Sequence, residues 1–270
     1  MLDLSPVALM LLALAATLVG FSKTAVPGAA TVTVAVFAAI LPARQSTGTL
    51  LVLLILGDVF AVSAYHAHAD WGALRRLVPT VLAGVVLGSL FLVIASDGVV
   101  RRVIGVTLLV LVAVTLVRRR HTASARANER TVPSTEPPGG TAAPWDRRAV
   151  QLRRLETGAY GILAGFTTMV ANAGGPVMSM YFLAARFSIT RFLGTAAWFF
   201  FAVNLAKVPF SVSLGLIGAA SLRLDLLLAP AVVVGAVVGR RVTRVIKQSV
   251  FDRLILVLTV VSATYLLLQS

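Results

Sequence analysis

Long apolar stretches separated by short polar segments follow one another along most of the 270-residue chain. A membrane-spanning helix needs about 20 apolar residues, and several of the stretches reach this length. The stretches lie near residues 6–22, 27–42, 46–66, 76–95 and 100–117, and, after a polar segment, near 154–171, 175–186, 190–214, 222–240 and 249–268. This pattern predicts an all-α polytopic membrane protein with about 8–10 membrane helices.

The polar segment divides the chain into two transmembrane repeats, predicted at residues 1–117 and 153–270. The linker between them, residues 118–152, is rich in Arg, Ser, Thr and Pro. Such a composition cannot bury a hydrophobic core, so we expect a disordered linker. When the boundaries of the stretches are counted outward from the linker, most of the 24 Lys and Arg residues fall on its side. The positive-inside rule therefore predicts a multi-pass protein of a prokaryotic cell membrane with a cytoplasmic linker.

An odd number of crossings in each repeat places the two repeats upside down relative to each other. Inverted-topology repeats are a common plan among secondary transporters. The stretch at 175–186 is short for a span, so the first two stretches of each repeat are alternatively a re-entrant or broken hairpin. Three full spans per repeat then remain, and the predicted inversion is unchanged.

Each repeat contains an apolar segment that Gly and Pro interrupt. The first, residues 20–28, reads Gly-Phe-Ser-Lys-Thr-Ala-Val-Pro-Gly, and the second, residues 165–176, reads Gly-Phe-Thr-Thr-Met-Val-Ala-Asn-Ala-Gly-Gly-Pro. Gly weakens a helix and Pro cannot continue one, so we expect a helix that stops and restarts in each segment. Unwound backbone at membrane depth is tolerated where it lines a cavity or is buried in protein. Paired breaks in corresponding halves therefore indicate the binding site of a transporter.

A helix that restarts after a break begins with N–H groups that lack intrahelical partners, and its dipole is positive there. Two such ends brought together predict a site for a small anion near the middle of the membrane. The alternative is that Gly and Pro only let the helices kink and pack, and that the hydroxyl groups bond back to freed helix carbonyls. The candidate substrate-binding residues are Ser22, Lys23, Thr24, Pro27, Gly28, Thr167, Thr168, Asn172, Gly174, Gly175, Asn204 and Lys207.

Polar side chains also occur deep inside long apolar stretches. Asp58 and Asn204 occupy matching positions in the two repeats, and Lys207 follows Asn204 on the same helix face. A buried carboxylate in a transporter is a candidate proton carrier, which assigns that role to Asp58. The alternative is a structural ion pair between Asp58 and Lys23 or Lys207, and Lys23 has the further alternative of extending to the membrane surface. The aromatic run at residues 198–201 is interpreted as packing.

The Cys, His and charge content of the chain argues against several classes of function. The chain has no Cys and its three His form no metal-ligand pattern, so we expect neither a metal nor a cofactor. The net charge is +14, and the basic residues lie between apolar stretches rather than in a patch with aromatic residues. This distribution argues against nucleic-acid binding. The expected partners are the lipid bilayer and a small anionic substrate. A secondary transporter is the main hypothesis, and an integral-membrane enzyme or a non-transporting membrane subunit is the alternative.

The sequence also resembles the sulfite exporter TauE/SafE family, known too as the four-toluene-sulfonate uptake permease family. The resemblance lies in the two homologous halves, the Pro-terminated motif near the start of each, the Gly-Thr steps at 48–49 and 194–195, and the pair Asp70-Trp71. Where the family usually has a denser Gly cluster, this chain has Ser-Lys-Thr-Ala at residues 22–25. The resemblance implies membrane transport of sulfur-containing or organic anions, such as sulfite, sulfoacetate and other sulfonates. For the transporter hypothesis we expect a mechanism of alternating access.

Overall fold

The computed structural model describes residues 4–25, 30–107, 109–110, 113, 147–184, 187, 189–242 and 268. Within these ranges the chain is helical apart from short connections, and no β-strand occurs. The helices are α1 (Pro6–Thr24), α2 (Ala30–Ile40), α3 (Ala43–Tyr65), the 3-10 helix η1 (His66–His68), α4 (Trp71–Ile94), α6 (Arg147–Ala171), α7 (Gly174–Ala184), α8 (Ile189–Ser213) and α9 (Ala219–Val242). Residues 97–107 are also helical.

The described part of the chain contains five helices that are long and apolar enough to cross a membrane. Their spans are Pro6–Thr24, Ala43–His68, Trp71–Ile94, Arg191–Ser213 and Ala219–Arg241. The predicted all-α polytopic membrane protein is thereby confirmed. The last predicted stretch, 249–268, lies outside the described residues apart from Leu268.

Two of the helices are shorter than the stretches that predicted them. α2 and α7 have 11 residues each, too few for a full span of about 20. α6 begins at Arg147, so residues 147–152, which the sequence assigned to the linker, are helical. Residues 118–146, the rest of the predicted linker, lie outside the described part of the chain.

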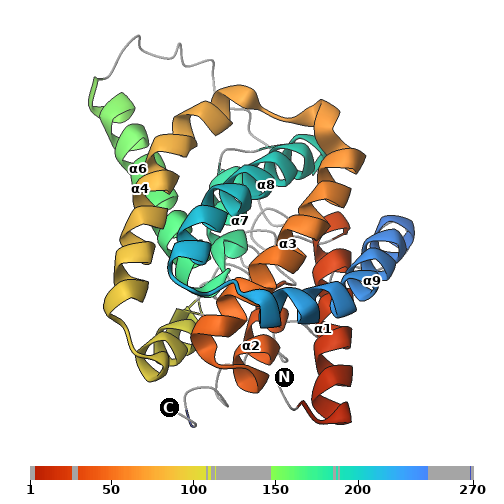
Figure 1. Cartoon of the computed structure of the whole chain (residues 1–270). Coiled ribbons are helices and arrows are strands. Elements are labelled where there is room, and N and C mark those ends of the chain that lie inside the picture. Colours follow the sequence, from red (N-terminus) through yellow and green to blue (C-terminus); the bar gives the residue numbers. More distant parts are fainter. Residues whose placement is uncertain are drawn as a thin grey trace, which may run out of the picture.

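α3 and α8 cross at the centre of the molecule and run in opposite directions (Figure 1). Near the start of α3, a Cβ atom on Gly48 would lie 2.0 Å from the carbonyl oxygen of Leu216, just beyond the end of α8. Near the start of α8, a Cβ atom on Gly194 would lie 2.8 Å from the carbonyl oxygen of Tyr65, where α3 ends. The start of each helix thus lies beside the end of the other, so α3 and α8 are antiparallel.

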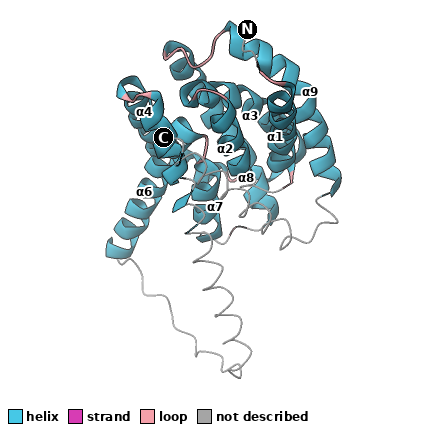
Figure 2. Cartoon of the chain, turned by 90° about the horizontal axis from the view of Figure 1, so that it is seen from below, coloured by secondary structure: helices cyan, strands magenta, loops and turns pink. Residues whose placement is uncertain are grey.

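The outer helices pair across the two halves of the chain. α1 lies beside α9 and α4 lies beside α6, on opposite sides of the central helices (Figures 1 and 2). Gly20 and Gly235 allow the first approach, because a Cβ atom on either would lie 1.9 Å from a backbone oxygen of the partner helix. Gly84 and Gly165 allow the second, with corresponding distances of 2.2 and 2.1 Å. Small residues that bring backbones together are typical of membrane helix pairs.

The motifs Asp70-Trp71 and Gly194-Thr195 meet where α3 turns into α4. The backbone N–H of Asp70 donates to the Thr195 hydroxyl at 2.9 Å, and the Asp70 carboxylate pairs with Arg191. The same carboxylate caps α4 by accepting from the N–H of Ala73 at 3.0 Å. Partial burial disfavours its charge, but the hydrogen bonds from Ala73 and Arg191 outweigh this and leave the pKa of Asp70 below its usual value. The contact fastens the start of α8 to the start of α4.

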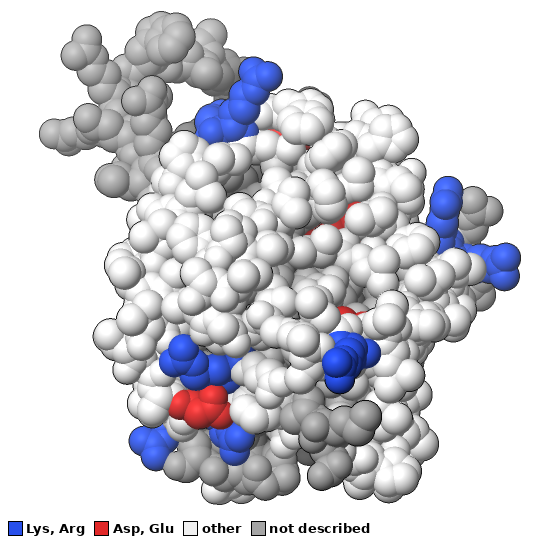
Figure 3. Space-filling view, in the orientation of Figure 1, with Lys and Arg blue, Asp and Glu red and all other residues white. Residues whose placement is uncertain are grey.

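Few charged side chains are visible in the middle of the face drawn in Figure 3, where only small areas of acidic atoms show between uncharged residues. Lys and Arg gather at its margins, whereas the area between them is mostly uncharged. Apolar side chains such as Leu90, Leu226 and Leu227 are exposed on α4 and α9. An apolar belt of this kind faces lipid in a membrane protein.

The close approach of α4 and α6 predicts opposite effects for two Gly-to-Ala substitutions in one helix. Gly165→Ala should destabilise the protein by about 1–3 kcal/mol, because the added methyl group meets backbone that must move. Gly158→Ala should be neutral or stabilising, since its nearest neighbour outside the helix lies 3.8 Å away and Ala favours a helix over Gly. Thermal unfolding in detergent measures both variants. Equal melting temperatures would contradict the tight α4–α6 contact.

Candidate functional site

A long helix ends and a short helix begins at each of the two interrupted segments: α1 and α2 at the first, and α6 and α7 at the second. Between α1 and α2, residues 26–29 lie outside the described part of the chain, and Pro27 and Gly28 with them. Between α6 and α7, Asn172 has a φ of 49°. This left-handed conformation is one that Asn adopts more readily than most residues, and it ends α6.

The first described N–H group of α2 has a partner within the protein. The backbone N–H of Ala30, the first residue of α2, donates to the hydroxyl oxygen of Ser22 at 3.1 Å. Ser22 therefore links the end of α1 to the start of α2 across the break. The predicted start of this helix at Pro27 and Gly28 lies outside the described residues, so the prediction of an open helix end there is not tested.

Asp58, in the second half of α3, is fully buried. One of its oxygens, Oδ1, lies 2.6 Å from the Lys23 ammonium nitrogen of α1. The other, Oδ2, accepts a hydrogen bond of 2.6 Å from the amide nitrogen of Asn204 on α8. The structure thus contains the Asp58–Lys23 ion pair that was one alternative interpretation of the sequence. It also joins positions 58 and 204 by a direct hydrogen bond.

Lys23 has a second favourable contact besides the carboxylate. Its ammonium nitrogen lies 4.6 Å from the centre of the Phe200 ring. An aromatic face attracts a cation through its quadrupole, and more strongly where water is excluded. Lys23 is only 11% exposed, so it points into the protein and not toward the membrane surface.

Lys207 is also fully buried, but its surroundings differ from those of Lys23. Its ammonium nitrogen donates to the carbonyl oxygen of Thr168 and to the side-chain oxygen of Asn172, both at 2.6 Å. The Thr168 hydroxyl and the side-chain oxygen of Asn204 lie 3.3 Å away. Each of these acceptors is neutral. The end of α6 and the break after it therefore wrap around the cation.

Asn204 connects the two cations. Its amide nitrogen donates to Asp58, and its amide oxygen accepts from Lys207. The resulting network contains Lys23, Asp58, Asn204, Lys207 and Asn172, and it joins α1 and α3 of the first half to α6 and α8 of the second. With its three ionisable groups charged, it holds two cations and one anion inside a low-dielectric interior.

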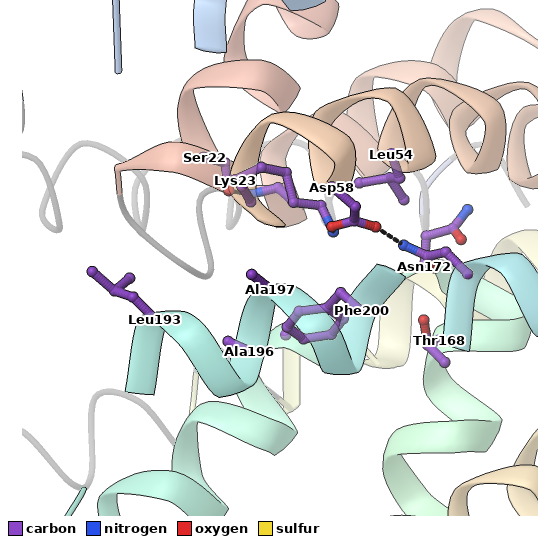
Figure 4. Close-up of a pocket in the computed structure, with 14 residues that line it drawn as sticks. Ser22, Lys23, Leu54, Asp58, Thr168, Asn172, Leu193, Ala196, Ala197 and Phe200 are labelled. Carbon is purple, nitrogen blue, oxygen red and sulfur yellow. Dashed lines mark hydrogen bonds and ion pairs between the residues drawn. The ribbon is translucent and has the colours of Figure 1, made fainter. Parts of the chain in front are cut away.

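A cavity of about 50 Å³ lies beside this network (Figure 4). One buried water needs about 10–15 Å³, so the cavity has room for several waters or a small ion. Lys23 and Asp58 extend into it from α1 and α3, with Phe200 on the facing helix. Its lining includes seven of the residues that the sequence singled out: Ser22, Lys23, Asp58, Thr168, Asn172, Gly175 and Asn204.

Four further candidates do not line the cavity. The Thr24 hydroxyl donates to the carbonyl oxygen of Ala236 at 3.0 Å and so fastens α1 to α9. Thr167 donates back to its own helix at 2.7 Å, the alternative noted for the hydroxyl residues. Gly174 packs against Thr168, and Lys207 lies behind the lining and contacts it.

Sequence reasoning missed Phe200 as a site residue, because an aromatic run in an apolar stretch is ordinarily packing. Its spacing of four residues from Asn204 was an available signal, since both then share a helix face. Thr47 was also missed. Its carbonyl oxygen accepts from the amide of Asn172 at 2.9 Å, which fixes the side-chain oxygen of Asn172 toward Lys207.

Span-length apolar helices around a buried ionic network define a multi-pass membrane protein with an internal polar site. A family model described as Sulfite exporter TauE/SafE matches residues 12–266. The chain belongs to this family of membrane transporters, which confirms the resemblance seen in the sequence. No curated protein and no solved structure matches the chain.

The buried ion pair predicts a strong effect of removing one partner. Lys23→Met should destabilise the protein by about 3–5 kcal/mol, because it leaves Asp58 buried without its counter-ion. The double variant Lys23→Met/Asp58→Leu should recover much of this loss. Arg191→Gln provides the control, since its pair with Asp70 is half exposed and is worth about 1 kcal/mol or less. Denaturation in detergent measures all three, and a double variant less stable than Lys23→Met would refute the pairing.

Proposed function

We propose that the protein is a secondary transporter of small sulfur-containing anions, sulfite or an organosulfonate, and that it works by alternating access. The observation that carries the proposal is the buried network beside the cavity, with two cationic side chains and one carboxylate. Lys207 contacts only neutral oxygens among the described residues. A buried charge without a counter-ion is costly, and an anion in the cavity offsets it.

Membership of a sulfite exporter family supports the substrate class. Sulfite and sulfonates present several oxygens that accept hydrogen bonds, and the site presents ammonium, amide and hydroxyl groups that donate them. Charge-assisted hydrogen bonds are the strongest of these contacts. A cavity beside both breaks also favours transport over the role of a non-transporting subunit, for which a solidly packed interior is expected.

In the proposed mechanism, two inverted-topology repeats make alternating access possible. The antiparallel course of α3 and α8 supports this plan, as does the exchange of partners in the pairs α1–α9 and α4–α6. Two inverted repeats with unlike conformations can exchange those conformations, which opens the central site to one side and then to the other. The short helices α2 and α7 are then the re-entrant halves of broken hairpins.

The proposed orientation places the linker in the cytoplasm of a prokaryotic cell. Arg75 and Arg76 at the start of α4, and Arg240 and Arg241 at the end of α9, then lie on the cytoplasmic side. Arg44 lies at the opposite end of α3 from His66, on the outer side. This distribution follows the positive-inside rule.

Flux of anions into proteoliposomes tests the proposed function. We expect uptake of sulfite or methanesulfonate that saturates with concentration. Lys207→Met should weaken the apparent affinity by about tenfold, because it removes a buried cation that lies directly behind the cavity lining and attracts an anion in the cavity through the low-dielectric interior. The matched control is Arg75→Gln, which removes an exposed positive charge far from the network and should transport normally. Wild-type vesicles that take up no sulfite, sulfonate or thiosulfate would refute the proposal.

A further inference from the structure

The carboxylate of Asp58 holds the donors that an anion in the cavity would need. Lys23 and Asn204 both line the cavity, and both direct their donor groups at Asp58 over 2.6 Å. Asp58 lines the cavity as well, although it is fully buried within the protein. The protein's own anion therefore occupies the cationic face of the site.

The remaining strong donors near the cavity also have acceptors. The amide nitrogen of Asn172 donates to the carbonyl oxygen of Thr47, and Lys207 donates to Thr168 and Asn172. An anion that enters the cavity while Asp58 is charged would meet a second negative charge close by. In an interior of low dielectric constant, two such charges repel strongly. In this geometry, a substrate anion and the Asp58 carboxylate compete for the N–H donors of Lys23 and Asn204.

We propose that Asp58 is a built-in competitor of the transported anion, and that its protonation admits the substrate. This inference rests on the anion transport proposed above. A proton from the aqueous phase binds a carboxylate oxygen of Asp58 and makes it a neutral acid. The Lys23 ammonium and the Asn204 amide then turn their N–H donors to the anion. When the anion leaves, Asp58 releases its proton and pairs with Lys23 again, so one proton travels with each anion.

The charged neighbours of Asp58 make proton and anion binding mutually dependent. Lys23 on α1 pairs with it directly, and Lys207 on α8 lies on the far side of Asn204. A nearby cation favours the ionised form of a carboxylate. α2 carries no ionisable side chain. An incoming anion offsets the two cations and thereby favours the protonated form. Linkage requires the reverse as well, so protonation of Asp58 raises the affinity for the anion.

Among the described residues, the other helices around Asp58 add no charged side chain to the network. α6 faces it with the neutral side chains of Thr168 and Asn172. α9 carries a buried acid, Asp225, whose two carboxylate oxygens have no hydrogen-bond partner among the described residues. Asp225 is thus a second buried acid outside the network, and it provides a matched control for Asp58.

Calorimetry with methanesulfonate tests the competition, because this anion keeps one negative charge across pH 5–8. For the wild-type protein in detergent, we expect the dissociation constant to rise about tenfold per pH unit above the pH at which Asp58 ionises. Titrations in two buffers of different ionisation enthalpy should show uptake of one proton per anion. Asp58→Asn should bind methanesulfonate without proton uptake and with pH-independent affinity, whereas Asp225→Asn should keep the wild-type pH dependence.

Proton uptake by the wild-type protein on methanesulfonate binding tests the competitor role of Asp58 even if a variant fails to fold. Anion binding without proton uptake would overturn the competitor role and leave anion transport standing. Asp58→Asn with the pH dependence of the wild type, or Asp225→Asn without it, would also overturn the role of Asp58. If no tested anion binds or crosses the membrane, the proposed function fails, and this inference fails with it.

Discussion

The structure depends on the charge balance where α3 and α8 cross. A single carboxylate, Asp58, is shared between the Lys23 ammonium and the Asn204 amide, while Lys207 contacts neutral oxygens. Burying these groups is unfavourable unless each finds a partner. The partners come from four helices in both halves of the chain, so the network ties the two halves together at their common centre.

The helix pairs on either side keep this centre in place. α1 lies against α9 and α4 lies against α6 at distances that only Gly permits, with a Cβ on Gly20 or Gly165 placed about 2 Å from a backbone oxygen of the partner. These contacts hold the ends of α1 and α6 toward the crossing, which is where the breaks must lie to line one cavity. The close helix pairs therefore position the residues of the central polar network. This arrangement is consistent with a member of the TauE/SafE family of transporters.

Much of the fold followed from the sequence. Long apolar stretches predicted the membrane helices, since a helix satisfies its backbone hydrogen bonds internally and about 20 apolar residues suffice to cross the lipid. The paired breaks and the matching positions 58 and 204 indicated a central site, and the structure joins Asp58 to Asn204 by a hydrogen bond. The directions in which individual side chains point could not be predicted from the sequence. Thr24 and Thr167 lie in the predicted segments, yet Thr24 bonds to α9 and Thr167 to its own helix.

The sequence by itself determined which stretches are apolar enough to cross a membrane and where Gly and Pro disfavour a continuous helix. A polar group in an apolar stretch, or Gly beside Pro, is visible without any partner. Only the tertiary structure decided which of those polar groups meet. A helix that is apolar on all sides carries no pattern that says which side faces its neighbour. The pairing of Lys23 with Asp58, the ring of Phe200 beneath that cation and the neutral surroundings of Lys207 therefore depend on how the helices cross.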